Sequence, residues 1–215
     1  HVYEAAKRSN KGEVYVATPD QKIIDLVKNS GGKAVKTFNN HQTGTDRIYE
    51  VFNETLACKP SVIVNLQGDM PNIDPKAIKD LIDYMYKDKC EIGTLASKLS
   101  SNSELEDENV VKVLVKQKMK PGEFIEAVDF VRIHSNKKHQ VYHHIGIYAF
   151  TNKALMRYVN LKRSKLELER KLEQLRAMEN DMSIHVGYIN SSPLSVDTEK
   201  DLLEVKKLME KNEKN

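Results

Sequence analysis

Residues 61–71, with the sequence SVIVNLQGDMP, form an almost uninterrupted apolar run that ends in a polar turn. A short run of this kind predicts a strand that is buried on both faces, as in a parallel sheet. Ligands of open α/β sheets bind at the carboxyl ends of strands, where Gln67 and Asp69 stand. The Asp69 carboxylate is a hard oxygen ligand that could share Mg²⁺ with substrate phosphates. On this segment alone, a role for Asp69 in capping the turn before Pro71 is an equally good interpretation.

Predicted strands and helices alternate around this first strand. Up to residue 86 the sequence predicts a helix at 1–12, a strand at 13–18, a helix at 21–30, a strand at 34–38, a helix at 45–53, a strand at 61–66 and a helix at 74–86. This rhythm predicts an α/β fold with a doubly wound, mostly parallel sheet.

The middle of the chain has a different pattern. It has predicted strands at 92–99, 109–116, 126–132 and 142–150, with few helices between them. This region predicts a smaller mixed or antiparallel extension of the sheet. After it the sequence predicts helices at 151–159 and 165–180, a strand at 183–189 and a last helix from Thr198. We expect residues 1–215 to form a single domain, to which about 92–150 contribute the mixed-sheet region.

Composition narrows the class of protein. The 215 residues include 34 Lys and Arg against 31 Asp and Glu, and a net charge of +3 is weak evidence for a nucleic-acid ligand. The two cysteines, Cys58 and Cys90, are too few for a disulfide scaffold and favour a reducing, cytosolic compartment. No stretch approaches the ~20 uncharged apolar residues of a membrane span. Zinc motifs, Walker loops, dinucleotide fingerprints and nucleophile elbows are also missing from the sequence.

Two further segments could bind a charged ligand. Asp197, which lies between Val196 and Thr198, could cap the last helix or could join Asp69 as a ligand of one divalent cation. Both roles could coexist, with Thr198 capping and Asp197 facing the ion. The run HQTGTDR at 41–47 predicts a helix N-terminus that can accept an anion or a polar ring. For this run alone, a capped helix with a surface arginine is the more economical interpretation.

A fourth group of polar residues could line a sugar pocket. Arg132 ends a predicted strand, His144 stands near the start of the next, and Glu173 and Gln174 fall within the predicted helix at 165–180. On composition alone, an exposed charged helix is the commoner explanation for the last two residues.

Taken in order, these segments resemble a known family. The motifs that carry the resemblance are H-Q-T-G-T-D-R, V-N-L-Q-G-D-x-P, N-x-V-K-V, H-I-G-I-Y, L-E-Q-L-R and V-D-T-x-x-D-L. Their combination resembles the 3-deoxy-manno-octulosonate cytidylyltransferases, also called CMP-Kdo synthetases, from His1 to the last helix. Members of this family have a nucleotidyltransferase-type α/β fold and are usually homodimers.

The resemblance implies a cytoplasmic transferase of lipopolysaccharide biosynthesis that requires Mg²⁺. In this reaction the anomeric hydroxyl of Kdo attacks the α-phosphate of CTP, and CMP-Kdo and pyrophosphate are formed. Positioning and electrostatics supply most of the acceleration, so no protein nucleophile is needed. By motif position, the resemblance implies Asp69 and Asp197 as catalytic metal ligands, Thr43, Arg47 and Gln67 around the nucleotide, and Arg132, His144, Glu173 and Gln174 around the sugar.

The chain also departs from the family pattern. It starts in the helix that follows the family's phosphate-binding loop, so we expect a further segment before His1 in the natural protein. Met70 stands where the family usually has Glu, which leaves no carboxylate at that position. Two alternatives stay open, namely activation of another acidic sugar such as sialic acid and a non-catalytic nucleotide-binding paralogue. We expect no membrane partner, because no stretch is apolar enough to span a membrane. We expect no nucleic-acid partner, because Trp is missing and no basic face is interleaved with aromatic residues.

Overall fold

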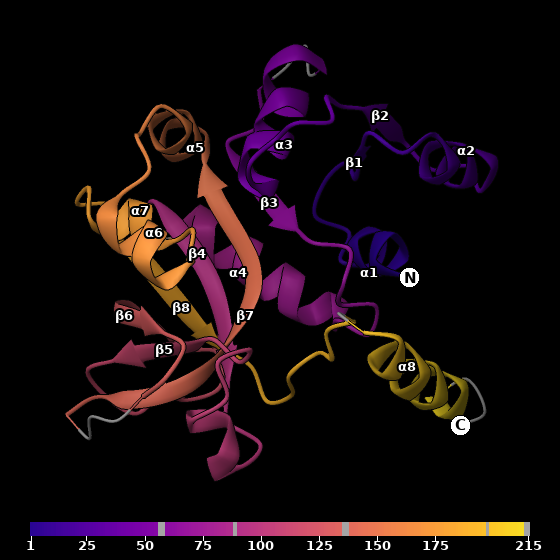
Figure 1. Cartoon of the computed structure of the whole chain (residues 1–215). Coiled ribbons are helices and arrows are strands. Elements are labelled where there is room, and N and C mark those ends of the chain that lie inside the picture. Colours follow the sequence, from indigo (N-terminus) through magenta and orange to yellow (C-terminus); the bar gives the residue numbers. More distant parts are fainter. Residues whose placement is uncertain (56–58, 88–89, 135–137, 197, 213–215) are drawn as a thin grey trace.

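The computed structural model describes residues 1–55, 59–87, 90–134, 138–196 and 198–212, and Figure 1 shows their arrangement. The strands are β1 (Val16–Thr18), β2 (Ala34–Lys36), β3 (Val62–Leu66), β4 (Ile92–Ser97), β5 (Lys112–Val115), β6 (Phe124–Val131), β7 (Gln140–Thr151) and β8 (Ile184–Tyr188). The α-helices are α1 (Val2–Arg8), α2 (Gln21–Asn29), α3 (Gly44–Glu50), α4 (Pro75–Lys87), α5 (Asn152–Val159), α6 (Lys165–Arg170), α7 (Leu175–Met178) and α8 (Glu199–Asn212). No helix in these ranges is long and apolar enough to cross a membrane.

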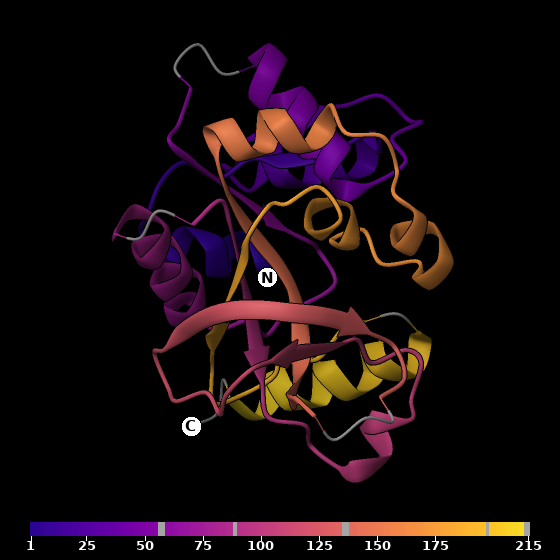
Figure 2. The ribbon, with the colours of Figure 1, turned by 90° about the vertical axis from the view of Figure 1, so that its left-hand side faces the viewer.

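The long strand β7 organises the larger sheet, whose order is β3-β7-β4-β8-β6-β5. Both neighbours of β7 run antiparallel to it, and Asn65 of β3 and Thr94 of β4 are each paired with Tyr148. β4 and β8 are parallel, whereas β6 is antiparallel to both β8 and β5. β5 also pairs with the first half of β7. As a result, β5 and β6 lie at the end of the sheet that is remote from α3 and α5 (Figure 2).

The α/β class and the mixed sheet are confirmed. Among the described strands of the larger sheet, β4–β8 is the one parallel pair and the other pairs are antiparallel. The strand expected at 142–150 lies between β3 and β4 rather than in a peripheral extension. β1 and β2 form a separate parallel pair. Both faces of β3 contact a hydrophobic core. Because β3 is an edge strand of the larger sheet, Asn65 is its one fully buried residue.

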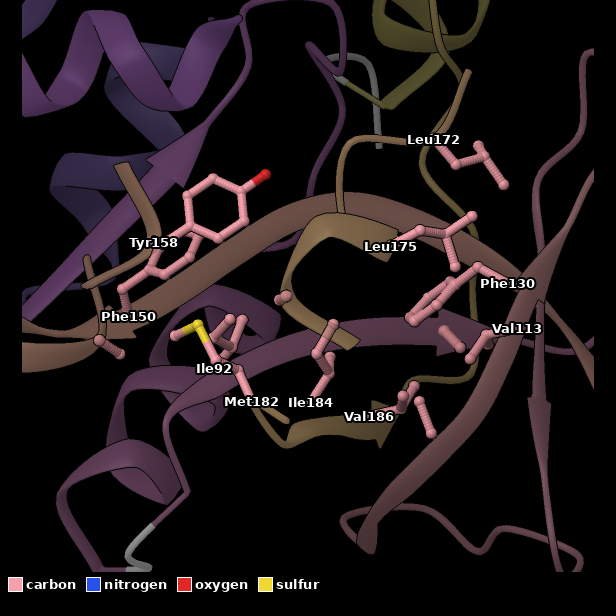
Figure 3. Packing of buried hydrophobic residues seen from close by; sticks show 14 of the residues in the cluster. Ile92, Val113, Phe130, Phe150, Tyr158, Leu172, Leu175, Met182, Ile184 and Val186 are labelled. Carbon is pink, nitrogen blue, oxygen red and sulfur yellow. The ribbon is translucent and has the colours of Figure 1, made fainter. Parts of the chain in front are cut away.

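Two hydrophobic cores cover the two faces of the larger sheet. One core includes side chains from α5, α7 and the strands β4, β6, β7 and β8, and Figure 3 shows Phe130, Phe150 and Tyr158 among them. The other core packs α1 and α4 against the opposite face. Gly93 of β4 permits this close approach, because a Cβ atom there would lie 2.9 Å from Leu81 Cδ1 of α4. These cores fix the strand ends and turns from which the candidate site is built.

The helix predicted at 165–180 is interrupted. Lys171 adopts a left-handed conformation, with φ 54° and ψ 46°, and ends α6. At the start of that helix, the Glu167 carboxylate accepts a hydrogen bond from Ser164 N at 3.1 Å. Glu173 and Gln174 therefore lie in the turn before α7, and the prediction that they lie on a helix face is wrong.

Candidate active site

A cleft of about 400 Å³ opens where the turn after β3, the middle of β7 and the turn between α6 and α7 meet. The loop before β5 and the segment after β8 complete its walls. The predicted site residues that line it are Gln67, Asp69, Arg132, His144, Glu173 and Gln174. Segments that are up to 128 residues apart in the sequence, at Gln67 and Ser195, therefore share one surface.

Asp69 connects two walls of this cleft. Its backbone carbonyl accepts a hydrogen bond from Val196 N at 2.8 Å, and its Oδ2 accepts one from Ser195 Oγ at 3.1 Å. Its Oδ1 is buried and has no hydrogen-bond partner within the described residues. A buried carboxylate oxygen without a donor is costly, which makes this atom a suitable ligand for a cation. Met70, the next residue, is buried in the core of the α4 face.

Asp197 lies outside the described residues, so its pairing with Asp69 stays a prediction. The residues on either side of it are described. Val196 N is hydrogen-bonded to the Asp69 carbonyl. Thr198 caps α8, because Thr198 Oγ1 accepts from Asp201 N at 3.2 Å and Thr198 N donates to Asp201 Oδ2 at 2.8 Å. Thr198 therefore performs the capping role that the sequence left open between these two residues. No group of three or more metal-ligating His, Cys, Asp or Glu side chains occurs in the part of the chain that the structure describes.

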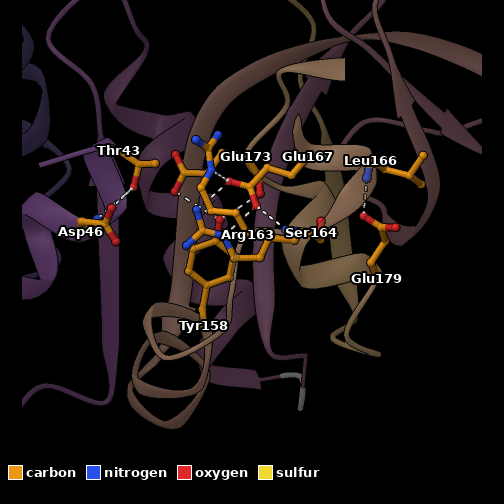
Figure 4. Close-up of polar contacts among 10 residues, drawn as sticks. Thr43, Asp46, Tyr158, Arg163, Ser164, Leu166, Glu167, Glu173 and Glu179 are labelled. Atoms are coloured by element: carbon orange, nitrogen blue, oxygen red, sulfur yellow. Dashed lines mark hydrogen bonds and ion pairs between the residues drawn. The ribbon is translucent and has the colours of Figure 1, made fainter. Parts of the chain in front are cut away.

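The predicted nucleotide side of the site is the first turn of α3. Thr43 caps this helix by accepting from Asp46 N at 3.2 Å, and its hydroxyl donates to Asp46 Oδ2 at 2.9 Å (Figure 4). Asn65 Nδ2 donates to Thr45 Oγ1 at 3.2 Å. The α3 turn is therefore joined to the end of β3, directly before Gln67.

Arg47 has a different environment from the one expected. Its side chain is half-buried rather than on the surface. Its NH1 group donates to Thr37 Oγ1 at 2.6 Å and to the Phe38 carbonyl at 3.0 Å. The guanidinium group therefore stabilises the loop after β2. The role of Arg47 in nucleotide binding stays a prediction.

His144 is a buried, neutral hydrogen-bonding group. Burial, with a smaller effect of His143, lowers the pKa of His144 to about 3. Its Nε2 lies 3.0 Å from Thr94 Oγ1, which also lies 2.7 Å from the Ile147 carbonyl. Because a hydroxyl has one hydrogen, donation to this carbonyl requires Thr94 to accept from an Nε2–H tautomer of His144. His144 Nδ1 is then an acceptor.

Arg132 joins three segments of the wall. Its Nε donates to the Arg170 carbonyl at 3.0 Å, NH1 to the Glu108 carbonyl at 2.8 Å and NH2 to the Lys171 carbonyl at 3.1 Å. Two of its five N–H groups are left over from these contacts. The fully buried Lys112 in turn donates to the carbonyl of Arg132, and burial lowers the pKa of Lys112.

Glu173 lies between the first turn of α3 and the cleft. Burial raises the pKa of its carboxyl group, and the hydroxyls of Thr45 and Thr43 oppose that shift by stabilising the charged form. Tyr158 OH lies 2.9 Å from the Glu173 carbonyl and 3.2 Å from its Oε1. Gln174, the next residue, is buried and lines the same cleft.

Several cleft residues were not assigned to the site from the sequence, namely Asn109, His143, Tyr148, Lys171 and Ser195. Asn109 begins the N-x-V-K-V motif and Tyr148 ends H-I-G-I-Y, so both carried a usable signal. No sequence motif pointed to Lys171 or Ser195. Lys171 reaches the cleft because α6 ends there, and Ser195 because its hydroxyl donates a hydrogen bond to Asp69.

The fold and this site define a nucleotidyltransferase. Residues 1–184 match the model of a family described as cytidylyltransferase, and the chain belongs to that family. Two relatives are named 3-deoxy-manno-octulosonate cytidylyltransferase. The protein of Thermodesulfovibrio yellowstonii is 38% identical and covers 94% of this chain and 84% of its own, and that of Bradyrhizobium sp. is 39% identical and covers 98% and 85%. Within the family, the chain belongs with the 3-deoxy-manno-octulosonate cytidylyltransferases.

Solved structures agree with this placement. The structure of CMP:2-keto-3-deoxy-manno-octonic acid synthetase complexed with CTP matches with a TM-score of 0.85 and 30% identity, over 98% of this chain and 88% of that one. A 4-diphosphocytidyl-2C-methyl-D-erythritol synthase from Anaerococcus prevotii shares the fold, with a TM-score of 0.62, 14% identity and coverage of 97% and 89%. The predicted family, fold class and enzyme class are thereby confirmed.

Proposed function

We propose that this protein transfers CMP from CTP to the anomeric hydroxyl of 3-deoxy-D-manno-octulosonate and releases pyrophosphate. The observation that carries this proposal is the single cleft that contains both Asp69, with its buried oxygen, and the Glu173-Gln174 turn. A nucleotide and a sugar can therefore meet there. The names of the relatives and the CTP in the similar solved structure support the two substrates.

We propose Mg²⁺ as the cofactor, with Asp69 and Asp197 as its protein ligands. The buried Asp69 Oδ1, which has no partner within the described residues, fits a hard cation. Two carboxylates suffice, because Mg²⁺ usually completes its coordination with substrate phosphates and water. When bound, the ion would neutralise phosphate charge and polarise the α-phosphoryl group.

The remaining residues would orient the two substrates. Thr43, Arg47 and Gln67 are proposed to surround the nucleotide. Arg132, His144, Glu173 and Gln174 are proposed to contact the sugar. His144 would act as a neutral hydrogen-bonding group, because its pKa of about 3 keeps it uncharged near neutral pH. The cations Arg132 and Lys112 would favour an acidic sugar, since neither forms an ion pair within the described residues.

We further propose a cytoplasmic homodimer that acts in lipopolysaccharide biosynthesis and forms one domain over residues 1–215. The family resemblance supports the dimer and the pathway. The low number of cysteines supports a reducing compartment.

Measurement of pyrophosphate release tests the proposed function. The protein is incubated with CTP and Mg²⁺, and with Kdo, sialic acid or no sugar. The proposal predicts release that depends on Kdo. Release that depends on sialic acid instead would favour the other substrate, and CTP binding without release in calorimetry would favour a non-catalytic paralogue.

A further inference from the structure

A buried ion pair lies directly behind the cleft. Glu167 of α6 is fully buried and Arg176 of α7 is 3% exposed. Arg176 Nε lies 2.9 Å from Glu167 Oε2, and its NH2 lies 2.7 Å from Oε1. Arg163 Nε and Ser164 N add bonds to the same carboxylate at 2.9 and 3.1 Å. A buried ion pair is stable only when further hydrogen bonds satisfy its charged groups, as they do here. None of these residues lines the cleft.

Tyr158 connects this ion pair to the cleft. The guanidinium carbon of Arg176 lies 4.8 Å from the centre of the Tyr158 ring, which is a cation–π contact in a buried place. The single hydroxyl hydrogen of Tyr158 is shared between two acceptors of Glu173, its carbonyl at 2.9 Å and its Oε1 at 3.2 Å. Figure 4 shows Tyr158, Glu167 and Glu173 converging from separate segments. The Tyr158 side chain therefore contacts the buried charge of Arg176 through its ring and the cleft residue Glu173 through its hydroxyl.

Glu173 depends on neutral hydroxyl groups for its orientation. Within the described residues it forms no ion pair shorter than 4.0 Å. Its carboxylate faces the Thr45 and Thr43 hydroxyls on the α3 side and Tyr158 on the core side. A carboxylate accepts hydrogen bonds, so an ionised Glu173 suits hydroxyl donors of a polyhydroxylated ligand.

We propose that Tyr158 is a positioning residue for the sugar side of the cleft. Its hydroxyl sets the orientation of the Glu173 carboxylate, and the Glu167–Arg176 pair fixes the Tyr158 ring. This inference rests on the proposed function, because Glu173 is taken to contact the sugar. Tyr158 itself does not line the cleft.

The substitution Tyr158→Phe tests this proposal, because it removes the hydroxyl and keeps the ring that packs against Arg176. Tyr142→Phe is the matched control. The Tyr142 hydroxyl is also buried and accepts from Met119 N at 2.9 Å, but it has no contact with Glu173. Both variants are assayed by pyrophosphate release at a temperature at which circular dichroism shows them folded.

We expect kcat/KM for Kdo to fall about tenfold or more in Tyr158→Phe, while KM for CTP changes less than about twofold; the loss of a buried bond to a charged group sets this scale. Tyr142→Phe should lower the melting temperature about as much as Tyr158→Phe does, but should leave the kinetics near those of the wild type.

The pH dependence gives a second readout. The Tyr158 hydroxyl lowers the pKa of Glu173, as do Thr45, Thr43 and the positive charge of Arg176, and Tyr148 lies nearby as a neutral group. Without that hydroxyl, the acid limb of kcat/KM for Kdo should move to higher pH in Tyr158→Phe alone. A Tyr158→Phe enzyme with unchanged kcat/KM for Kdo and an unchanged acid limb would overturn the inference. A wild-type enzyme that does not use Kdo would instead overturn the proposed function.

Discussion

Substitution of Glu167 by Gln should destabilise the fold strongly. Glu167 is fully buried and accepts two bonds from Arg176 and one from Arg163, at 2.7 to 2.9 Å. Loss of its charge leaves the buried Arg176 guanidinium unpaired. Removal of one partner of a buried pair costs about 3–5 kcal/mol. A domain typically unfolds with about 5–15 kcal/mol, so this single change should remove a large share of the stability.

Urea denaturation, followed by far-UV circular dichroism, measures this loss. Glu169→Gln is the matched control, because Glu169 lies on the same helix, is 54% exposed, and lies 3.7 Å from Lys165. An exposed pair of this kind contributes about 0.3–0.5 kcal/mol. A double substitution, Glu167→Leu with Arg176→Met, should recover part of the loss, because it buries no unpaired charge. Equal midpoints for Glu167→Gln and Glu169→Gln would refute this reasoning.

Three other outcomes follow from the site. Asp69→Asn should melt near the wild-type temperature but lose pyrophosphate release by orders of magnitude, and retained turnover would argue against Asp69 as a metal ligand. Lys112→Met removes the Nζ contacts to the carbonyls of Asp107 and Arg132, so KM for Kdo should rise more than KM for CTP, and equal rises would contradict this link. The pKa of His144 falls from 6.5 to about 3 on folding, so between these values the unfolded chain binds more protons and stability drops as pH falls. Urea midpoints measured from pH 7 to 4 should therefore fall less in His144→Gln than in the wild type, and parallel curves would contradict the assignment.

Local signals in the sequence predicted local structure well. Asp20 caps the helix expected at 21–30, because its side chain can reach the Lys22 amide two residues on. The Thr43 cap is equally local. The apolar run of β3 and the turn that presents Asp69 were also visible, because strand and turn chemistry depend on adjacent residues.

Long-range pairing was not visible in the same way. The sequence of β7 shows a strand, but it does not show that this strand lies between β3 and β4. Lys171 ends α6 in a left-handed conformation that glycine usually adopts, so the break in the helix at 165–180 had no signal. That break determines where Glu173 and Gln174 lie.

The arginines show the same limit. Sequence identifies a donor, but not the acceptor that it meets. Arg47 and Arg132 were assigned to substrates, and both donate to groups of the protein itself, at Thr37 and Phe38 and at three backbone carbonyls. Arg176 belonged to the L-E-Q-L-R motif, yet its partner Glu167 lies nine residues earlier and could be paired with it only in the folded chain.

A crystal structure of the protein with CTP and Mg²⁺ would show whether Asp69 holds the metal ion. We expect an ion at about 2.0–2.1 Å from Asp69 Oδ1, bound also by Asp197 and next to the α-phosphate of CTP in the cleft. CTP bound outside this cleft, or an ion bound without Asp69, would contradict this expectation.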